Sequence, residues 1–268
     1  PPTPMQKKKI MQYPDLQNVQ FYVGADSRKW NFPKSVFNHT KQEVVRDLCK
    51  FRRRKFFLHC PVNMNLSRHD GQGKAMFTNV QLHCQYLQNM PGSCVLHVGN
   101  GKQGGTIEDV AQNINRLDIP YNDSHQPTLL LENSSGSGHH LGWNIEEFRH
   151  LYEGMDRSKI GICIDTQHTF SSGWSQFENG YAVEKLWEDF DGVFGKPALI
   201  HLNDSKVPYG NRSDKHENLR QGYIWHNDFE SLLRLRELAQ DDDVHLTLET
   251  PHSRLHDDFI VLSYPLSN

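Results

Sequence analysis

Ile162-Cys163-Ile164-Asp165 is a short aliphatic run that ends on a carboxylate, between polar or glycine-containing segments. Such a run is typical of a buried parallel strand whose last residue emerges at the carboxyl end of its sheet. Five more runs end on or beside a metal-binding side chain: Phe56-Phe57-Leu58-His59, Cys94-Val95-Leu96-His97, Leu129-Leu130-Leu131-Glu132, Leu199-Ile200-His201 and His245-Leu246-Thr247-Leu248-Glu249. We therefore expect six strands that deliver ligands to one edge.

The spacing of these runs indicates a repeating strand and helix unit. Successive run ends lie roughly 33 to 48 residues apart, which is room for a strand, a helix and two loops. Helical periodicity occupies the intervals, over residues 40–51, 73–90, 106–117, 144–152, 182–190 and 228–240. Thr106 and Asn144 stand where a helix N-cap would, with Asp109 and Glu147 three positions later.

A seventh strand is predicted over residues 19–23, before the first ligand-bearing run. Seven strands in alternation with helices predict an α/β fold, a TIM (β/α)8-type barrel whose functional groups gather at the C-terminal ends of its strands. The count is one short of eight, and position 1 is Pro rather than Met. We therefore expect that the first strand is missing from this chain.

Length and composition favour one domain over residues 1–268, because 268 residues with 36% hydrophobic content can bury one sizeable core. No apolar stretch approaches the roughly 20 residues needed to cross a bilayer, so we expect no membrane partner. The five cysteines are odd in number and show no CxxC spacing. This usage favours reduced core thiols and an intracellular protein, in the nucleus or the cytoplasm.

Beyond the run ends, more ligand-type residues follow at short offsets. His168 lies three residues after Asp165, and Asp214 and His216 flank Lys215. Mixed imidazole and carboxylate ligands suit Zn²⁺, and Mn²⁺ or Fe²⁺ as substitutes. Taken singly, each position is more often a structural histidine or a salt-bridge partner, but six strands ending this way argue against coincidence. Nine such side chains exceed the needs of one ion, so we expect two or three metals, with a carboxylate such as Glu132 bridging two of them.

The net charge of −3 would be unusual for a nucleic-acid binder, but it counts side chains alone. Four candidate ligands are carboxylates: Glu132, Asp165, Asp214 and Glu249. If these hold three Zn²⁺ ions, the six added positive charges change the formal sum from −3 to +3. The overall charge therefore does not exclude a phosphate-containing substrate.

Three segments resemble the signatures of a known enzyme family. They are Leu129-Leu130-Leu131-Glu132-Asn133, then Ile160 to His168 with Ser171-Ser172-Gly173, and His201-Leu202-Asn203-Asp204-Ser205-Lys206 through Arg212-Ser213-Asp214-Lys215-His216-Glu217. The family is endonuclease IV, the metal-dependent apurinic/apyrimidinic DNA endonucleases of base-excision repair, and the resemblance extends over residues 19–251. It implies a TIM barrel that holds three zinc ions.

The resemblance also implies a ligand set, and all nine positions carry the expected residue type. By this resemblance, His59, His97 and Glu132 hold the first zinc, and Glu132, Asp165, His201 and Glu249 hold the second. His168, Asp214 and His216 hold the third.

Such a cluster would activate water to attack phosphorus and neutralise charge on the leaving O3′. Glu132 and Glu249 are the expected catalytic carboxylates, Glu249 by orienting the water or taking its proton. The residues themselves predict hydrolysis of a phosphate ester. The resemblance adds the substrate: a monomer is expected to cut duplex DNA 5′ to abasic sites and to trim blocked 3′ ends.

DNA contacts are less well specified. Arg28, Lys29 and Trp30 follow the first predicted strand and offer charge and an aromatic ring to the minor groove. Val62 stands where family members often carry an aromatic residue, so we expect the wedge that holds open the DNA to come from elsewhere or to be weaker. Arg220 replaces a common glycine and would add a phosphate contact.

Two other classes remain open. A xylose-isomerase-like sugar isomerase or epimerase shares the barrel and needs only one metal, for which Glu132, Asp165, His201 and Glu249 would suffice. A protein that binds abasic DNA without cutting it is the third class. Metal content distinguishes the isomerase, and incision with and without a chelator distinguishes the binding protein.

Overall fold

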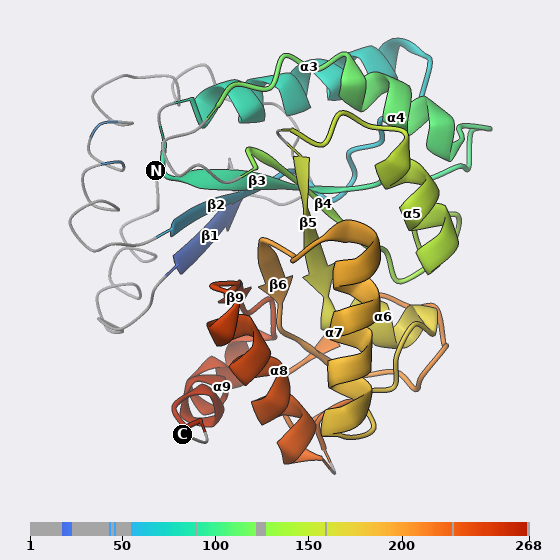
Figure 1. Cartoon of the computed structure of the whole chain (residues 1–268). Helices are drawn as coiled ribbons and strands as arrows, with labels where there is room; N and C mark the ends of the chain where they lie inside the picture. Colours follow the sequence, from blue (N-terminus) through green and yellow to red (C-terminus); the bar gives the residue numbers. More distant parts are fainter. Residues whose placement is uncertain are drawn as a thin grey trace.

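Seven parallel strands form the centre of the computed structural model (Figure 1). The structure describes residues 18–22, 43, 46, 55–88, 90–121, 127–158, 160–226 and 228–266. The strands are β1 (Asn18–Tyr22), β2 (Lys55–His59), β3 (Gly92–His97), β4 (Leu129–Glu132), β5 (Ile160–Asp165), β6 (Leu199–His201) and β9 (His245–Thr247). They pair in the order β1-β2-β3-β4-β5-β6-β9, each parallel to its neighbours.

The two ends of this sheet meet through side chains. Asn18 Nδ2 on β1 donates to the Leu246 carbonyl of β9 at 2.9 Å, and Thr247 Oγ1 donates to Asn18 Oδ1 at 2.8 Å. The predicted barrel is therefore confirmed, with seven described strands where the complete fold has eight. All seven strands were predicted, although β9 ends at Thr247, two residues before Glu249.

The helices cover the outside of the barrel (Figure 1). Five of the six predicted helices are present, and the sixth, over residues 40–51, falls almost wholly outside the described residues. The observed ones are α3 (Gly71–Tyr86), α4 (Ile107–Asn115), α5 (Ile145–Glu153), α7 (Gly180–Phe194) and α8 (Phe229–Asp241). Three further elements were not predicted from the sequence: α6 (Thr166–Ser172), the 3-10 turn His252–Arg254 and α9 (Leu255–Leu262). Every residue of α6 is buried although all but Phe170 are polar, so this helix has no apolar stripe opposite a polar face that sequence periodicity could detect.

The predicted helix starts are correct. Thr106 Oγ1 accepts from the Asp109 amide, and Asp109 Oδ2 accepts from the Thr106 amide, which is a complete capping box. Asn144 Oδ1 accepts from the Glu147 amide at 2.8 Å. These caps begin α4 and α5 directly after the loops that leave β3 and β4, so they fix where those loops end.

Apolar side chains fill the barrel interior and both outer layers. One cluster packs β2 to β5 against α3, α4 and α5, and a second packs β6 and β9 against α7 and α8. A small interior layer, fully buried, consists of Phe57, Val95, Leu130, Cys163 and Leu199. The four described cysteines are free thiols, as predicted. Within the described residues, no helix is long and apolar enough to span a bilayer.

Candidate metal centre

At the strand ends, a second layer of side chains points into the barrel, directly above the interior layer. Successive side chains of a strand point to opposite faces, so a residue and the one two positions later share a face. Each interior residue is followed two positions later by a metal-binding side chain: His59, His97, Glu132, Asp165 and His201. The same alternation that packs the core therefore aims five predicted ligands at the C-terminal mouth of the barrel.

Glu132 lies at the centre of this layer and is completely buried. Its Oε2 lies 3.1 Å from His59 Nε2 and 3.0 Å from His97 Nε2. Its Oε1 lies 3.1 Å from His201 Nδ1. The two oxygens of one carboxylate thus face two different groups of ligands, which is the arrangement that a bridging ligand requires.

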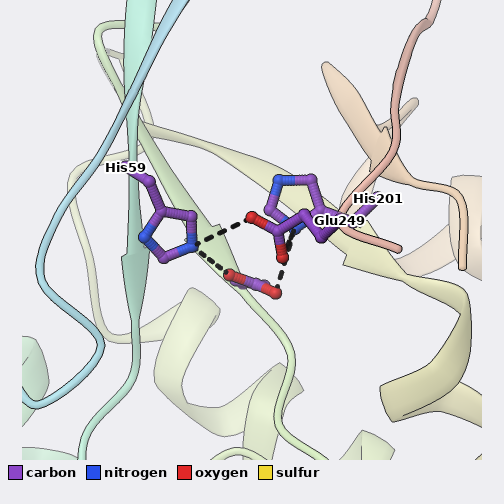
Figure 2. Close-up of side chains that lie close together, drawn as sticks. His59, His201 and Glu249 are labelled. Atoms are coloured by element: carbon purple, nitrogen blue, oxygen red, sulfur yellow. Dashed lines mark hydrogen bonds and ion pairs between the residues drawn. The ribbon is translucent and has the colours of Figure 1, made fainter. Parts of the chain in front are cut away.

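Glu249 and Asp165 surround His201. Glu249 Oε2 lies 3.4 Å from His201 Nδ1, and Glu249 Oε1 lies 3.9 Å from His59 Nε2. Figure 2 shows these three side chains, His59, His201 and Glu249, turned toward one another. Asp165 Oδ2 lies 3.9 Å from His201 Nδ1. His59, Glu132, His201 and Glu249 each offer a ligand atom within 4.8 Å of the others, a spacing that one cation could bridge.

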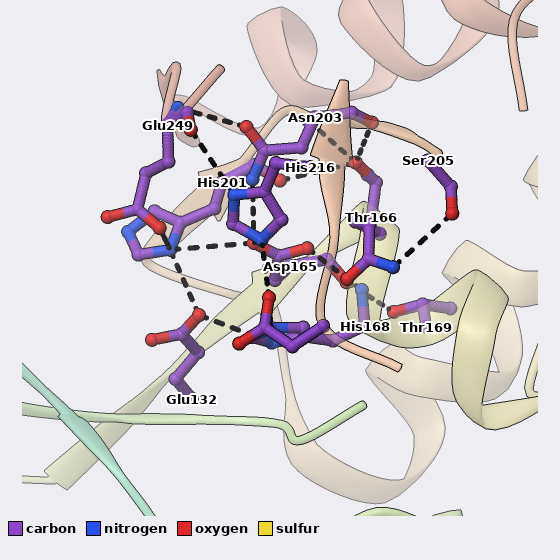
Figure 3. A network of polar contacts seen from close by, with 12 residues as sticks. Glu132, Asp165, Thr166, His168, Thr169, His201, Asn203, Ser205, His216 and Glu249 are labelled. Carbon is purple, nitrogen blue, oxygen red and sulfur yellow. Dashed lines mark hydrogen bonds and ion pairs between the residues drawn. The ribbon is translucent and has the colours of Figure 1, made fainter. Parts of the chain in front are cut away.

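A second group of possible ligands lies beside the first (Figure 3). His168 comes from α6, and His216 from a small antiparallel pair, β7 (Asp204–Ser205) and β8 (His216–Glu217). Asp214 Oδ1 lies 3.4 Å from His168 Nε2 and 3.3 Å from His216 Nε2. Asp165 Oδ2 lies 3.5 Å from His216 Nε2, so Asp165 stands between the two groups.

Two imidazoles of this second group carry a buried nitrogen without a hydrogen-bond partner, namely His168 Nε2 and His216 Nε2. Their other nitrogens are occupied: His168 Nδ1 donates to the Asn133 carbonyl at 2.9 Å, and His216 Nδ1 donates to the Glu249 carbonyl at 3.2 Å. A backbone contact of this kind fixes the tautomer of a metal-binding histidine. Both Nε2 atoms face carboxylate oxygens across a gap of 3.3 to 3.4 Å, so in the metal-bound form they could share a cation with those oxygens, and the donor set fits a cation.

The histidines and carboxylates shift one another's pKa values in opposite directions. Burial acts to lower the pKa of His168, but the carboxylates of Asp165 and Asp214 raise it well above its ordinary value. Burial also acts to lower the pKa of His97, and Glu132 raises it. Burial acts to raise the pKa of Glu132, yet His97 and His201 hold it well below its ordinary value. The imidazoles of the centre therefore tend to be protonated between the carboxylates, and a bound cation would displace these protons.

Two asparagines that were not predicted from the sequence to have a role hold the ligands in place. Asn203 Nδ2 donates to Asp165 Oδ2 at 2.7 Å, and Asn203 Oδ1 accepts from the Glu249 amide at 2.9 Å. Asn133 Oδ1 accepts from the Asp165 amide at 2.8 Å. Asn133 comes one residue after Glu132, and Asn203 comes two residues after His201. Their positions just after ligand-bearing strands were the signal in the sequence that could have identified them.

The residues expected to contact DNA are placed in part. Arg28, Lys29 and Trp30 lie outside the described residues. Val62 follows β2 and is 36% exposed. Arg220 has a left-handed φ of 63°, which accounts for a glycine being common there, and its guanidinium lies 4.9 Å from the centre of the Phe229 ring. The DNA contacts of these five residues remain predictions.

Comparisons with known proteins agree with this geometry. A family model described as a xylose isomerase-like TIM barrel matches residues 19–261. A probable endonuclease 4 of Carboxydothermus hydrogenoformans is 28% identical over 216 residues, covering 76% of this chain and 72% of that protein. A probable endonuclease 4 of Campylobacter hominis is 31% identical over 172 residues, covering 63% of this chain and 57% of that protein.

Among solved structures, endonuclease IV from Thermus thermophilus superposes with a TM-score of 0.77. The two chains are 22% identical, and the superposition covers 95% of this chain and 89% of the other, which supports the fold. The chain belongs to the family of xylose isomerase-like TIM barrels and, within it, to the endonuclease IV group.

Proposed function

We propose that this protein is a metal-dependent DNA repair endonuclease that cleaves the phosphodiester bond 5′ to an abasic site in duplex DNA. The observation that carries the proposal is the convergence of nine ligand-type side chains, among them the central Glu132, whose two oxygens face different groups. A sugar isomerase with one metal has no use for five of them: His59, His97, His168, Asp214 and His216. The relatives named endonuclease 4 support the same choice.

The donor atoms suggest how the cations would be shared. His59 Nε2, His97 Nε2 and Glu132 Oε2 would hold the first ion, and Glu132 Oε1, Asp165, His201 Nδ1 and Glu249 would hold the second. His168 Nε2, Asp214 and His216 Nε2 would hold the third. Imidazole with carboxylate oxygen suits Zn²⁺, and Mn²⁺ would be an acceptable substitute.

The charge of the centre explains why cations are required. Glu132, Asp165, Asp214 and Glu249 would together repel a phosphodiester, which is itself an anion. Bound divalent cations would offset that repulsion, lower the pKa of a water and stabilise the charge that develops on the phosphate oxygens. The fold therefore supplies the ligands, and the metals would supply the attraction for the substrate.

Glu132 and Glu249 have different surroundings and hence different roles. The Glu132 side chain has no exposure, so it can bridge but cannot exchange a proton with solvent. The Glu249 side chain is 15% exposed and has one oxygen near His59 and the other near His201. Glu249 is therefore the carboxylate placed to orient an attacking water or accept its proton.

The rim beside the metal centre carries an arginine side chain that could contact the DNA backbone. The Arg212 guanidinium stacks 3.7 Å from the centre of the Trp143 ring and is exposed. Arg212 precedes Asp214 by two residues, and Trp143 lies in the loop after β4, so both belong to the C-terminal face of the barrel. An abasic nucleotide costs less to unstack than a paired one, which would contribute to substrate choice.

The test is incision of a duplex that carries one abasic site, by the wild type and by Glu132→Gln. We expect the wild type to nick 5′ to the lesion and leave a 3′-hydroxyl that a polymerase extends, and Glu132→Gln to lose nearly all activity. A chelator should abolish nicking, and added Zn²⁺ or Mn²⁺ should restore it. Release of a blocking group from a 3′ end would follow the same pattern. Equal rates for the two proteins, or DNA binding without any incision, would contradict the proposal.

A further inference from the structure

Gln20, on β1, contacts two of the predicted ligands at once. Its Nε2 lies 2.5 Å from Glu249 Oε1, and its Oε1 lies 2.9 Å from His201 Nε2. Gln20 is separated from these residues by more than 180 positions in sequence, and the contact exists because β1 and β9 are neighbours where the sheet closes. Gln20 is not itself a predicted metal ligand.

The chemistry of these groups fixes the direction of each hydrogen bond. An ionised carboxylate can only accept, so the amide group of Gln20 must present its N–H to Glu249. The amide oxygen of Gln20 then faces His201, and an amide oxygen can only accept as well. His201 Nε2 must therefore carry a proton and donate it to Gln20.

This assignment leaves the other nitrogen of His201 for the metal centre. His201 Nδ1 is the atom that lies 3.1 Å from Glu132 Oε1 and 3.4 Å from Glu249 Oε2. When Nε2 is held as a donor, a cation that displaces the Nδ1 proton meets a neutral imidazole with its lone pair correctly aimed. The same amide group restrains the Glu249 carboxylate through its other oxygen.

We infer that Gln20 is a positioning residue of the proposed metal centre: it sets the tautomer of His201 and the orientation of Glu249 through one amide group. The inference rests on the proposed function, because it assigns His201 Nδ1 and Glu249 to the second cation. It concerns the binding of the cation and is measurable without any DNA.

Asn18 provides a matched control. It lies on the same face of β1, two residues before Gln20, and also makes two side-chain hydrogen bonds across the closure, to the Leu246 carbonyl and from Thr247 Oγ1. Neither partner is a predicted ligand. Removing either side chain therefore costs two hydrogen bonds at the closure, but only Gln20 affects the centre.

The experiment compares the zinc affinity of the full chain, by competition with a chromophoric chelator, for the wild type, Gln20→Met, Gln20→Glu and Asn18→Leu. We expect Gln20→Met to weaken the affected zinc site by about 10- to 100-fold, the usual loss when the partner of a metal-binding histidine is removed. Asn18→Leu should bind zinc like the wild type while lowering the unfolding temperature of the metal-free protein as much as Gln20→Met does. Gln20→Glu retains an acceptor for His201 Nε2 and should bind zinc more tightly than Gln20→Met.

Three results would overturn the inference: wild-type affinity in Gln20→Met, an equal loss in Asn18→Leu, or no advantage of Gln20→Glu over Gln20→Met. If Gln20→Met does not fold, Gln20→Ala takes its place in the series, with the same expected loss of zinc affinity, and wild-type affinity in Gln20→Ala would overturn the inference. The proposed function fails separately, if the zinc-loaded wild type does not incise abasic DNA. The comparison of zinc affinities among the variants would remain valid in that case.

Discussion

At the scale of single residues, Asp214 is a proposed ligand of the third metal position alone. It contacts His168 and His216, and its side chain is 38% exposed, whereas Glu132 is wholly buried. We predict that Asp214→Asn lowers the zinc content by about one ion per chain and reduces incision by more than about 100-fold, because a lost ion removes several kcal/mol of transition-state stabilisation. Elemental analysis and a nicking assay measure both effects.

The control for this variant is His69→Asn. His69 Nε2 lies 3.1 Å from Asp109 Oδ1, so it is also an imidazole paired with a carboxylate, but it is largely exposed and lies apart from the two ligand groups. Its zinc content and incision rate should equal those of the wild type. A zinc content that falls equally in both variants would show that the ions bind nonspecifically to exposed histidines.

Protonation of the centre predicts opposite pH dependences for the metal-free and zinc-loaded proteins. The raised pKa values of His97, His168 and His201 stabilise the fold fully below about pH 6.5, and this stability is lost as the pH rises through the folded pKa values. The lowered pKa values of Glu132 and Glu249 give stability that is present above about pH 4.5 and lost as the pH falls. The metal-free protein should therefore be most stable between these limits.

Zinc reverses the upper part of this profile, because bound zinc displaces the imidazole protons and binds more tightly as the pH rises. Between pH 6 and pH 8, the unfolding temperature of the metal-free protein should therefore fall. The difference between the unfolding temperatures of the zinc-loaded and metal-free proteins should grow over the same range. Differential scanning calorimetry at several pH values measures both. Parallel profiles would show that zinc does not compete with these protons.

At the scale of elements, helix caps are a stability feature separate from the centre. Thr106→Ala removes the capping box of α4 and should cost about 1 kcal/mol of unfolding free energy, while incision remains unchanged. Thr78→Ala is the control, because Thr78 Oγ1 donates to the Lys74 carbonyl on the exposed side of α3, and its loss should cost less than about 0.5 kcal/mol. Urea denaturation distinguishes them, and an equal cost would contradict the role of the cap.

Strands and long helices could be predicted because burial leaves a periodic pattern. The aliphatic runs before His59 and Asp165 predict their strands, and Thr106 and Asn144 predict helix starts. The pair β7 and β8 could not be predicted, since two-residue strands carry no periodicity. That pair nevertheless places His216, which residue type and spacing had marked as a candidate ligand, whereas its assignment to a third ion came from the resemblance.

The polar contacts that support the centre were also beyond prediction. Asn203 and Gln20 contact ligands from strands far apart in sequence, and such contacts depend on which strands become neighbours. The tautomers of His168 and His216 depend on single backbone carbonyls, which only coordinates reveal. Sequence therefore predicts which side chains gather, and structure adds which atoms face one another.

At the scale of the whole molecule, the proposed function assigns DNA binding to only one end of the barrel. Arg212 lies at the C-terminal end of the barrel, stacked on Trp143. Arg116 follows the last residue of α4 and so lies at the opposite end, where its guanidinium is 5.4 Å from the centre of the Phe77 ring. We predict that Arg212→Ala weakens binding to abasic duplex DNA and reduces the slope of log affinity against log salt by about one. Arg116→Ala should change neither quantity.

These measurements are made in the Glu132→Gln background, so that the DNA stays intact, with fluorescence anisotropy at several salt concentrations. Equal effects of the two arginines would show that the DNA contacts both ends of the barrel, or neither.

The central claim is that one barrel mouth gathers separate cations around Glu132. The most direct measurement is an anomalous difference map, recorded at the zinc absorption edge from crystals of the zinc-loaded protein. The account predicts one peak among His59, His97 and Glu132, a second among Glu132, Asp165, His201 and Glu249, and a third among His168, Asp214 and His216. A single peak beside Glu132, or peaks only at exposed histidines, would contradict it.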